Sequence, residues 1–460
     1  MQTVIAGGTI VTAASTYEAD VLINGGRIAL LGEGLPTEGS EVVDAAGKFV
    51  FPGALDVHTH LDTPWGTQYT TVDDWRSGTV GAVCGGTTTL VDFALQTEGQ
   101  ALREAIDGWH AKAEGNAVID YGFHAMIMDL TDSVQAEIPR VIQDEGIPSF
   151  KVFMAYKGVV QADDETLLHT MFTAAEHGGL TMVHAENGDA TVVLQNRFAE
   201  RGDLGVEFWP KSRPPELEAE AAHRAITLAG LAGAPLYIVH VSSAGAVAEI
   251  SRARASGQAI YGETCPQYLV LDEDRYTQPD GAKWVMAPPL RHASHQEPLW
   301  RALASGNLQT VATDHSAWPL KDFKDQSLDD FRYMIQGVPG VEERLSTLYT
   351  YGVQAGRITF NRFVDVTSTG PAKLFGLYPQ KGDIAVGSDA DLVVWDAEVE
   401  WMLTKDKLHG NTDYCTFEGI PVRGRASHVF SRGRALVREG DYVGGKGGGR
   451  FLRRAAFATP

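Results

Sequence analysis

Six residues with metal-binding or charged side chains stand at the ends of short apolar runs. They are His58, His60, Lys151, His184, His240 and Asp314. Residues two apart on a strand point to the same side, so the imidazoles of His58 and His60 face the same way. Imidazole nitrogens and carboxylate oxygens are ligands of zinc and similar divalent ions. A single interior histidine is more often a hydrogen-bonded core residue, but four histidines and an aspartate at equivalent strand ends favour a metal centre.

Lys151 needs a separate explanation, because divalent cations would repel its ammonium group and burying that group unpaired is costly. From the residue alone, three interpretations stay open. The side chain could extend to solvent, or it could pair with Asp314. Alternatively, desolvation and the charge of the metals could deprotonate the amine, which would then take up carbon dioxide as a carbamate. A carbamate is an anion with two oxygens, and it could bridge two metal ions.

The segments that must position these residues alternate between apolar runs and helical stretches. The strand candidates are the eight runs 53–60, 87–93, 121–127, 149–154, 180–186, 236–241, 259–263 and 309–315. Helical patterns between them include Ser133–Asp144 (with Pro139 as a candidate break), Asp164–His177, Leu217–Leu231 and Ala244–Ala255. This alternation predicts an α/β fold, a parallel (β/α)8 barrel with its catalytic groups at the C-terminal ends of the strands. The alternative is a doubly wound open sheet, but no Gly-x-Gly-x-x-Gly motif follows the first strand, which argues against a dinucleotide site.

Both ends of the chain have a different texture, with short alternating runs rich in Val, Ile, Gly and Thr, as in Asp20–Ile28. Such runs predict short strands joined by tight turns. Together the two ends would build one small β-sandwich domain. We therefore expect residues 1–52 and 376–436 in the sandwich, 53–375 in the barrel, and 437–460 in a basic, glycine-rich C-terminal arm.

The composition restricts the classes of function. The chain has 38 Lys and Arg against 59 Asp and Glu, a net charge of −21, so we expect no nucleic-acid and no membrane partner. Its three cysteines, Cys84, Cys265 and Cys415, form no disulfide or zinc-ribbon pattern. The first residues, Met1–Gly8, lack the features of a signal peptide. These features fit a reducing, cytoplasmic location.

The candidate ligands lie within longer motifs that span nearly the whole chain. The motifs are Phe51-Pro52-Gly53, Asp56-Val57-His58-Thr59-His60, Gly85-Gly86-Thr87-Thr88-Thr89, Ser149-Phe150-Lys151-Val152-Phe153-Met154-Ala155-Tyr156, Val183-His184-Ala185-Glu186-Asn187, Tyr237-Ile238-Val239-His240-Val241, Glu263-Thr264-Cys265-Pro266-Gln267-Tyr268 and Pro371-Ala372-Lys373-Leu374-Phe375-Gly376. Together they resemble the hydantoinase and dihydropyrimidinase branch of the cyclic amidohydrolases. The resemblance implies a (β/α)8 barrel with a terminal β-sandwich and two divalent metal ions, zinc first, with manganese or cobalt as alternatives. It also implies that Lys151 is carboxylated (N6-carboxylysine) and bridges the ions.

The resemblance also implies a role for each site residue. His58, His60, Lys151 and Asp314 would bind one ion, and Lys151, His184 and His240 the other. Asp314 would shuttle a proton from the bridging water to the leaving nitrogen, and Tyr156 would donate to the oxyanion, although an aromatic simply packed over the barrel mouth is the alternative for Tyr156. Ala287 and Gln336 stand where the family usually has Ser and Asn, at positions that hold the amide edge of the substrate. Trp65 and Phe153 would shape the pocket, with Trp65 either a wall or a loop anchor.

The implied reaction is the opening of a small cyclic amide, a hydantoin or dihydropyrimidine, to an N-carbamoyl amino acid by a two-metal bridging hydroxide. An anionic ring is disfavoured, because Asp62 stands where dihydroorotase-like relatives have an Arg that holds the substrate carboxylate. An allantoinase-like hydrolase and a non-catalytic scaffold homologue are the alternatives. Relatives use a C-terminal arm to dock on neighbouring subunits, so we expect a homotetramer, or at least a homodimer.

Overall fold

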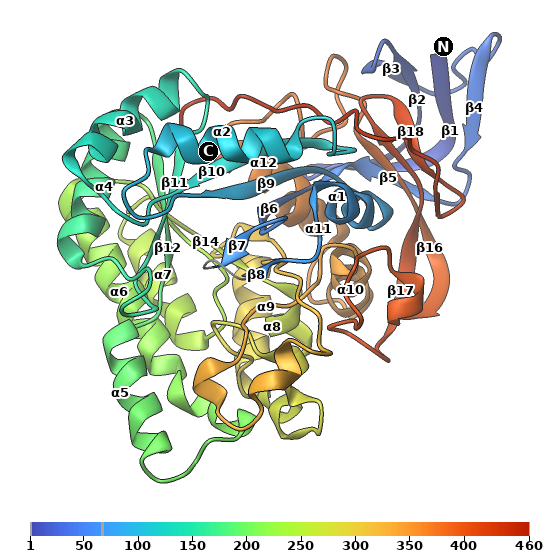
Figure 1. Cartoon of the computed structure of the whole chain (residues 1–460). Helices are drawn as coiled ribbons and strands as arrows, with labels where there is room; N and C mark the ends of the chain where they lie inside the picture. The colour runs from blue at the N-terminus through green and yellow to red at the C-terminus, as the bar shows by residue number, and fades with distance from the viewer. Residues whose placement is uncertain (1, 66–68, 460) are drawn as a thin grey trace.

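The computed structural model describes residues 2–65 and 69–459, and at its centre eight parallel strands form one sheet (Figure 1). In chain order the strands are β6 (Ala54–Thr59), β9 (Thr87–Leu95), β10 (Asp120–Met126), β11 (Ser149–Phe153), β12 (Leu180–His184), β13 (Leu236–Ile238), β14 (Ile260–Thr264) and β15 (Thr310–Val311). Each strand pairs with the strands before and after it in this order. All eight predicted runs therefore contain a strand, although β13 and β15 are shorter than predicted.

The sheet closes into a barrel because its first and eighth strands are joined. Thr59, at the end of β6, forms a parallel bridge with His315. The His60 N–H donates to the His315 carbonyl at 2.8 Å. The buried Asp56 carboxylate adds a link by accepting the hydroxyl of Thr313 at 2.7 Å. This closure confirms the predicted barrel and excludes the doubly wound open sheet, in which the outer strands do not meet.

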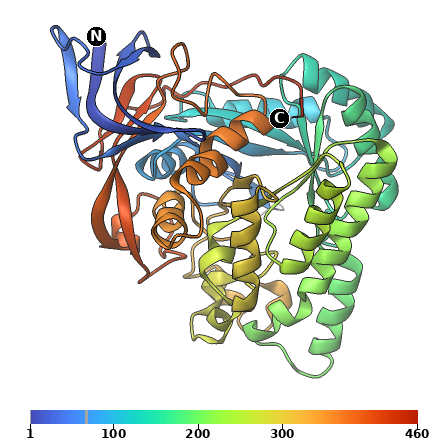
Figure 2. The same cartoon turned by 180° about the vertical axis from the view of Figure 1, so that it is seen from behind.

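Helices connect the strands and cover the outside of the barrel (Figures 1 and 2). The longer ones are α1 (Trp75–Cys84), α2 (Leu102–Ala113), α3 (Asp132–Gln143), α4 (Asp164–Glu176), α5 (Gly188–Ala199), α6 (Pro215–Ala232), α7 (Ala244–Ala255) and α9 (Gln296–Ser305). Capping explains several helix starts, since Asp74, Thr131 and Asp163 accept N–H groups of the first turns of α1, α3 and α4. Pro139 lies inside α3 and does not end it. Across residues 2–65 and 69–459, no helix is long and apolar enough to cross a membrane.

The two ends of the chain build a separate, mostly antiparallel sheet beside the barrel (Figure 1). Its N-terminal strands are β1 (Gln2–Val11), β2 (Thr16–Asn24), β3 (Arg27–Gly32), β4 (Ser40–Asp44) and β5 (Phe49–Pro52), and its C-terminal strands are β16 (Leu392–Met402), β17 (Pro421–Ser431), β18 (Arg434–Arg438) and β19 (Asp441–Tyr442). The two groups meet where β5 pairs antiparallel with β16. A small apolar core that includes Ile5, Val21, Val394 and Phe430 fills this unit. The prediction of a β-rich unit made from both termini is confirmed.

The last residues of the chain cross the barrel at the N-terminal ends of its strands. The Leu452 N–H donates to Tyr121 at the start of β10, and the Arg454 N–H donates to Gly146 in the loop before β11. The side chain of Arg454 is 4% exposed and donates to the Ser149 hydroxyl at 2.7 Å. This segment therefore closes the floor of its own barrel. Docking of the arm on a neighbouring subunit stays a prediction.

Candidate metal centre and substrate cavity

A cavity of about 310 Å3 opens at the C-terminal ends of the barrel strands. Its lining contains every site residue predicted from the sequence: His58, His60, Trp65, Lys151, Phe153, Tyr156, His184, His240, Ala287, Asp314 and Gln336. These residues come from seven separate segments of the chain. The volume is at the lower end of the range for small-molecule sites, so the cavity suits a compact ligand.

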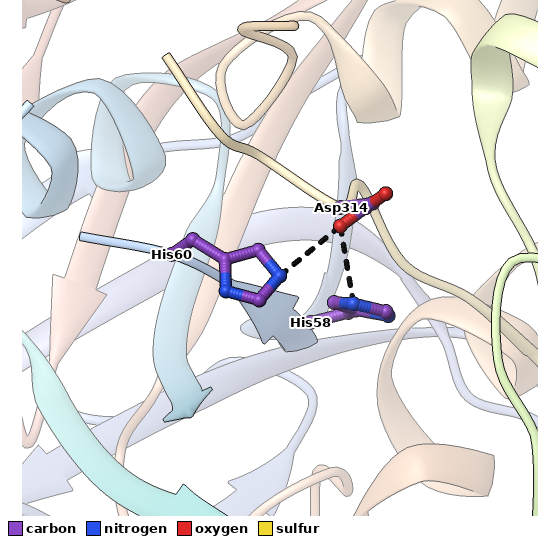
Figure 3. Close-up of side chains that lie close together, drawn as sticks. All are labelled: His58, His60 and Asp314. Atoms are coloured by element: carbon purple, nitrogen blue, oxygen red, sulfur yellow. Dashed lines mark ion pairs between the residues drawn. The ribbon is translucent and has the colours of Figure 1, made fainter. Parts of the chain in front are cut away.

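His58, His60 and Asp314 converge on one point at the cavity floor (Figure 3). The Nε2 atoms of His58 and His60 lie 3.1 and 3.2 Å from the same oxygen, Oδ1 of Asp314. The two histidines come from β6 and the residue that follows it, as the alternation of side chains along a strand predicts. Two imidazole nitrogens and a carboxylate oxygen facing one point are a donor set for a divalent cation.

The other two histidines extend this donor set along the cavity floor. The ring of His240 lies between those of His58 and His184, with centroids at 5.4 and 4.6 Å. Lys151, in the middle of β11, lines the same cavity and is 1% exposed. Its Nζ lies 4.9 Å from the ring centre of Phe93 and 4.5 Å from that of Phe153. Within the described residues, no carboxylate or other hydrogen-bond acceptor contacts this Nζ, so Lys151 points into the cavity and does not pair with Asp314.

Three side chains that line the cavity stand on strained backbone just beyond strand ends. Tyr156, His240 and Asp314 have φ angles of 67°, 41° and 53°, in the left-handed region. Such a conformation costs about 1–3 kcal/mol for a residue other than glycine and persists only where surrounding contacts impose it. It also explains the short strands: β13 ends at Ile238 and β15 at Val311, because the chain leaves the ladder to turn His240 and Asp314 into the cavity.

The charges around these residues fit a bound cation. Burial lowers the pKa values of His60, His184 and His240, so these three imidazoles are neutral and keep a lone pair for a metal. Burial also lowers the pKa of His58, but Glu263 and Asp314 outweigh it and raise the value to about 9. Without a metal ion, the His58 imidazole therefore carries a proton between these two carboxylates. A divalent cation bound there would supply the positive charge in place of that proton.

Two buried carboxylates lie behind the histidines, and no pattern in the sequence distinguishes them from structural residues. Glu263, the fourth residue of β14, contacts Nδ1 of His58 and accepts the N–H of His240 at 3.1 Å. Glu186 accepts from Nε2 of His184 at 2.7 Å and from Arg213 at 2.8 Å. A carboxylate on one ring nitrogen fixes the tautomer and directs the other nitrogen to the metal position. These contacts direct Nε2 of His58 and Nδ1 of His184 toward the cavity.

Lys151 and Tyr156 both have pKa values that burial has moved. Burial lowers the pKa of Lys151 to about 8, although Asp314 and Glu263 act against the shift. A substantial fraction of the amine is therefore neutral near physiological pH. Burial raises the pKa of the Tyr156 phenol, so this group stays protonated and can donate a hydrogen bond from the cavity wall.

The upper part of the cavity is mainly apolar. Trp65 and Phe153, both predicted, are joined there by Val159, Trp318 and Ile335. Trp65 is a wall of the cavity, with its ring 6.1 Å from that of His60. Sequence reasoning did not single out Trp318, which lies in the loop after β15, where no periodic pattern marks an inward-facing residue.

Hydrogen bonds join the two segments that carry Ala287 and Gln336. The Gly337 N–H donates to the Val285 carbonyl at 3.0 Å. The buried Lys324 amine donates to the same carbonyl at 2.9 Å and to that of Gly337 at 2.6 Å. Both segments are thus held through their main chains, independently of the side chains of Ala287 and Gln336.

Comparison with known proteins gives consistent results. A model described as the amidohydrolase family matches residues 49–436. The chain is 51% identical over 461 residues to D-hydantoinase of Geobacillus stearothermophilus, covering 100% of this chain and 98% of that protein. It is 47% identical over 461 residues to D-hydantoinase of Streptomyces coelicolor, covering 99% and 98%. Its structure is similar to that of dihydropyrimidinase from Brevibacillus agri NCHU1002, with a TM-score of 0.98 and 48% identity over the full length of both chains.

Proposed function

This chain belongs to the amidohydrolase family and is a cyclic amidohydrolase of the hydantoinase and dihydropyrimidinase type, and from that premise we propose that it opens hydantoin or dihydropyrimidine rings to N-carbamoyl amino acids. The observation that carries the proposal is that six candidate ligands line one small cavity, three of which (His58, His60 and Asp314) meet at one point. A scaffold that does no chemistry has no need for such a donor set. The names of the relatives favour D-configured substrates.

Two divalent ions would be held in this cavity. His58, His60, Lys151 and Asp314 would bind one, and Lys151, His184 and His240 the other. When bound, such ions lower the pKa of a water molecule and polarise a carbonyl oxygen. The set of imidazoles and carboxylates favours zinc, and manganese and cobalt are compatible with it.

Lys151 would serve as a ligand of both ions after it has reacted with carbon dioxide. The neutral amine attacks the carbon of carbon dioxide and loses a proton, which leaves a carbamate with one negative charge. Burial of Lys151, its lowered pKa and the absence of an acceptor at Nζ among the described residues support this step. Carboxylation would replace the unpaired amine of Lys151 with an anion, which the two cations would stabilise.

Asp314 and Tyr156 supply the proton transfer and part of the charge stabilisation. The Asp314 carboxylate accepts the proton of the attacking water and returns it to the ring nitrogen when the amide bond breaks. Burial raises the pKa of Asp314, but His58, His60 and His240 outweigh it. The net pKa lies well below the usual value, so Asp314 starts the reaction ionised. The Tyr156 hydroxyl donates to the oxygen that becomes negative as the carbonyl is attacked.

A hydrolysis panel tests the function. Purified protein is assayed with hydantoin, both enantiomers of a 5-substituted hydantoin, dihydrouracil, allantoin and dihydroorotate. We expect turnover of the hydantoins and dihydrouracil, with the N-carbamoyl amino acid as the product. Turnover restricted to allantoin or dihydroorotate would contradict the proposal. We also propose a homotetramer or homodimer, to be checked by light scattering.

A further inference from the structure

A second group of metal-binding side chains lies outside the cavity, where α1 of the barrel meets a loop of the terminal sheet. Cys84 is the last residue of α1, and His409 belongs to the loop between β16 and β17. The Cys84 Sγ lies 3.8 Å from Nε2 of His409. Glu342 completes the group, and one ligand atom from each residue lies within 4.8 Å of the others. None of these three residues lines the substrate cavity.

Glu342 fixes the orientation of His409. Its Oε1 lies 2.8 Å from Nδ1 of the ring, and its Oε2 accepts the His409 backbone N–H at 2.8 Å. With the Nδ1 proton held by this carboxylate, the lone pair of a neutral His409 is on Nε2, on the side of the thiol. A carboxylate behind the ring also raises the basicity of the ligating nitrogen. Glu342 therefore prepares His409 as a ligand.

The spacing of sulfur and nitrogen matches a tetrahedral ion. Zinc binds a thiolate at about 2.3 Å and an imidazole nitrogen at about 2.0–2.1 Å. At an angle of about 110–120° between them, these bonds place the two atoms roughly 3.6–3.8 Å apart. The observed 3.8 Å separation, which is that of a hydrogen bond between the thiol and the imidazole, also falls in this range, so a cation could bind both atoms without drawing them apart.

The site is open to solvent on the side of His409 and buried on the side of the thiol. The His409 side chain is 33% exposed, whereas Cys84 is 5% exposed, so an ion would enter past the imidazole. Burial raises the pKa of the Cys84 thiol, and Glu342 and Asp441 raise it further against the opposing charge of Arg425, so the thiol keeps its proton until a cation displaces it. A cavity of about 20 Å3 beside the site, lined by Gly81, Glu342 and Leu408, is large enough for one water molecule.

We propose that Cys84 and His409, with Glu342 behind the imidazole, form a binding site for one thiophilic divalent cation that is separate from the substrate cavity. The cation replaces the proton of the Cys84 thiol, which is released to solvent, and binds the thiolate sulfur and Nε2 of His409. Water completes its coordination. This site differs chemically from the metal centre, where the donors are nitrogen and oxygen.

Cobalt(II) titration of the full-length, metal-loaded protein tests the proposal, because a thiolate bound to cobalt gives a charge-transfer absorption that nitrogen and oxygen donors do not. We expect this absorption at one cobalt per chain, and its loss in both Cys84→Ser and Cys84→Ala. Cys415→Ser is the matched control, since Cys415 is also buried but has no histidine beside it, and it should keep the absorption. Glu342→Gln should weaken cobalt binding at this site by about 10- to 100-fold.

The outcomes separate this site from the catalytic metals. Hydrolysis by Cys84→Ser without added cobalt should equal that of the unmodified protein, because Cys84 lies outside the cavity. Absence of the absorption in the unmodified protein, or its persistence in Cys84→Ser and Cys84→Ala, would overturn the proposal.

Discussion

Glu263 offers a direct test of how the protein positions its metal ligands. A Glu263→Gln substitution keeps the size of the side chain and removes its charge. In the structure this carboxylate contacts the ring of His58 and the backbone N–H of His240, which belong to the two proposed metal positions. It also accepts the Tyr237 hydroxyl at 2.8 Å. The glutamine oxygen can replace the carboxylate toward the histidines, and the Tyr237 hydroxyl can turn to face the new amide N–H.

The expected loss follows from these contacts. Hydrogen bonds to charged groups contribute about 1.5–3 kcal/mol and neutral ones about 1 kcal/mol, so two bonds together lose about 1–4 kcal/mol. A central value of about 2 kcal/mol corresponds to a roughly 30-fold weaker metal affinity, at about 1.4 kcal/mol per factor of ten. Outer carboxylates of metal-bound histidines generally contribute about 10- to 100-fold, which agrees with this value.

The assay is competition with a chelator of known affinity, followed by elemental analysis of the protein. Asp391→Asn is the matched control, because Asp391 is also buried and accepts from Lys381 at 2.7 Å, but comes directly before β16 and does not line the cavity. We expect both variants to unfold at lower temperature and only Glu263→Gln to bind metal more weakly. Unchanged metal affinity in Glu263→Gln, or equal loss in the control, would refute the argument that this carboxylate orients the ligands.

Three further predictions concern single residues of the site and its support. Lys151→Ala should lose both metal and hydrolysis, with partial recovery when short-chain carboxylates are supplied; unchanged metal content would remove the bridging role. Tyr156→Phe should lower kcat by about 10²–10³ with metal content unchanged, whereas an undiminished kcat would show that Tyr156 only packs against the cavity. Burial lowers the pKa of His315, but the Asp73 carboxylate outweighs it and raises the net value. A raised histidine pKa stabilises the fold fully below the unfolded value, near 6.5, and this contribution is lost as the pH rises through the folded pKa. With both proteins metal-free, the Tm difference between the unmodified protein and His315→Gln should therefore be largest near pH 6 and shrink at higher pH. A constant difference would contradict the raised pKa of His315.

The sequence predicted the barrel and the site residues because both depend on patterns that repeat. Eight apolar runs predict eight strands, and the alternation of side chains along a strand places His58 and His60 on one face. The sequence did not predict that His240 and Asp314 lie beyond their strands, because their left-handed backbone is imposed by contacts between distant segments. For the same reason it did not distinguish Glu263 from other buried acidic residues. The roles of Lys151 and Tyr156 rest on the resemblance to known hydrolases and remain predictions.

The position of the last residues has a consequence for how the molecule is made. Arg454 fills the floor of the barrel, and β16 pairs with β5, which lies more than three hundred residues earlier in the chain. Until the segment with Arg454 has docked, the floor of the barrel is open, and until β16 has paired, one edge of β5 is free. Because these contacts join segments far apart in the sequence, they form late in folding, and until then the floor and the edge of β5 are exposed to other chains. A fusion partner attached after residue 460 would lie next to the segment that closes the floor, whereas one attached before residue 1 would not.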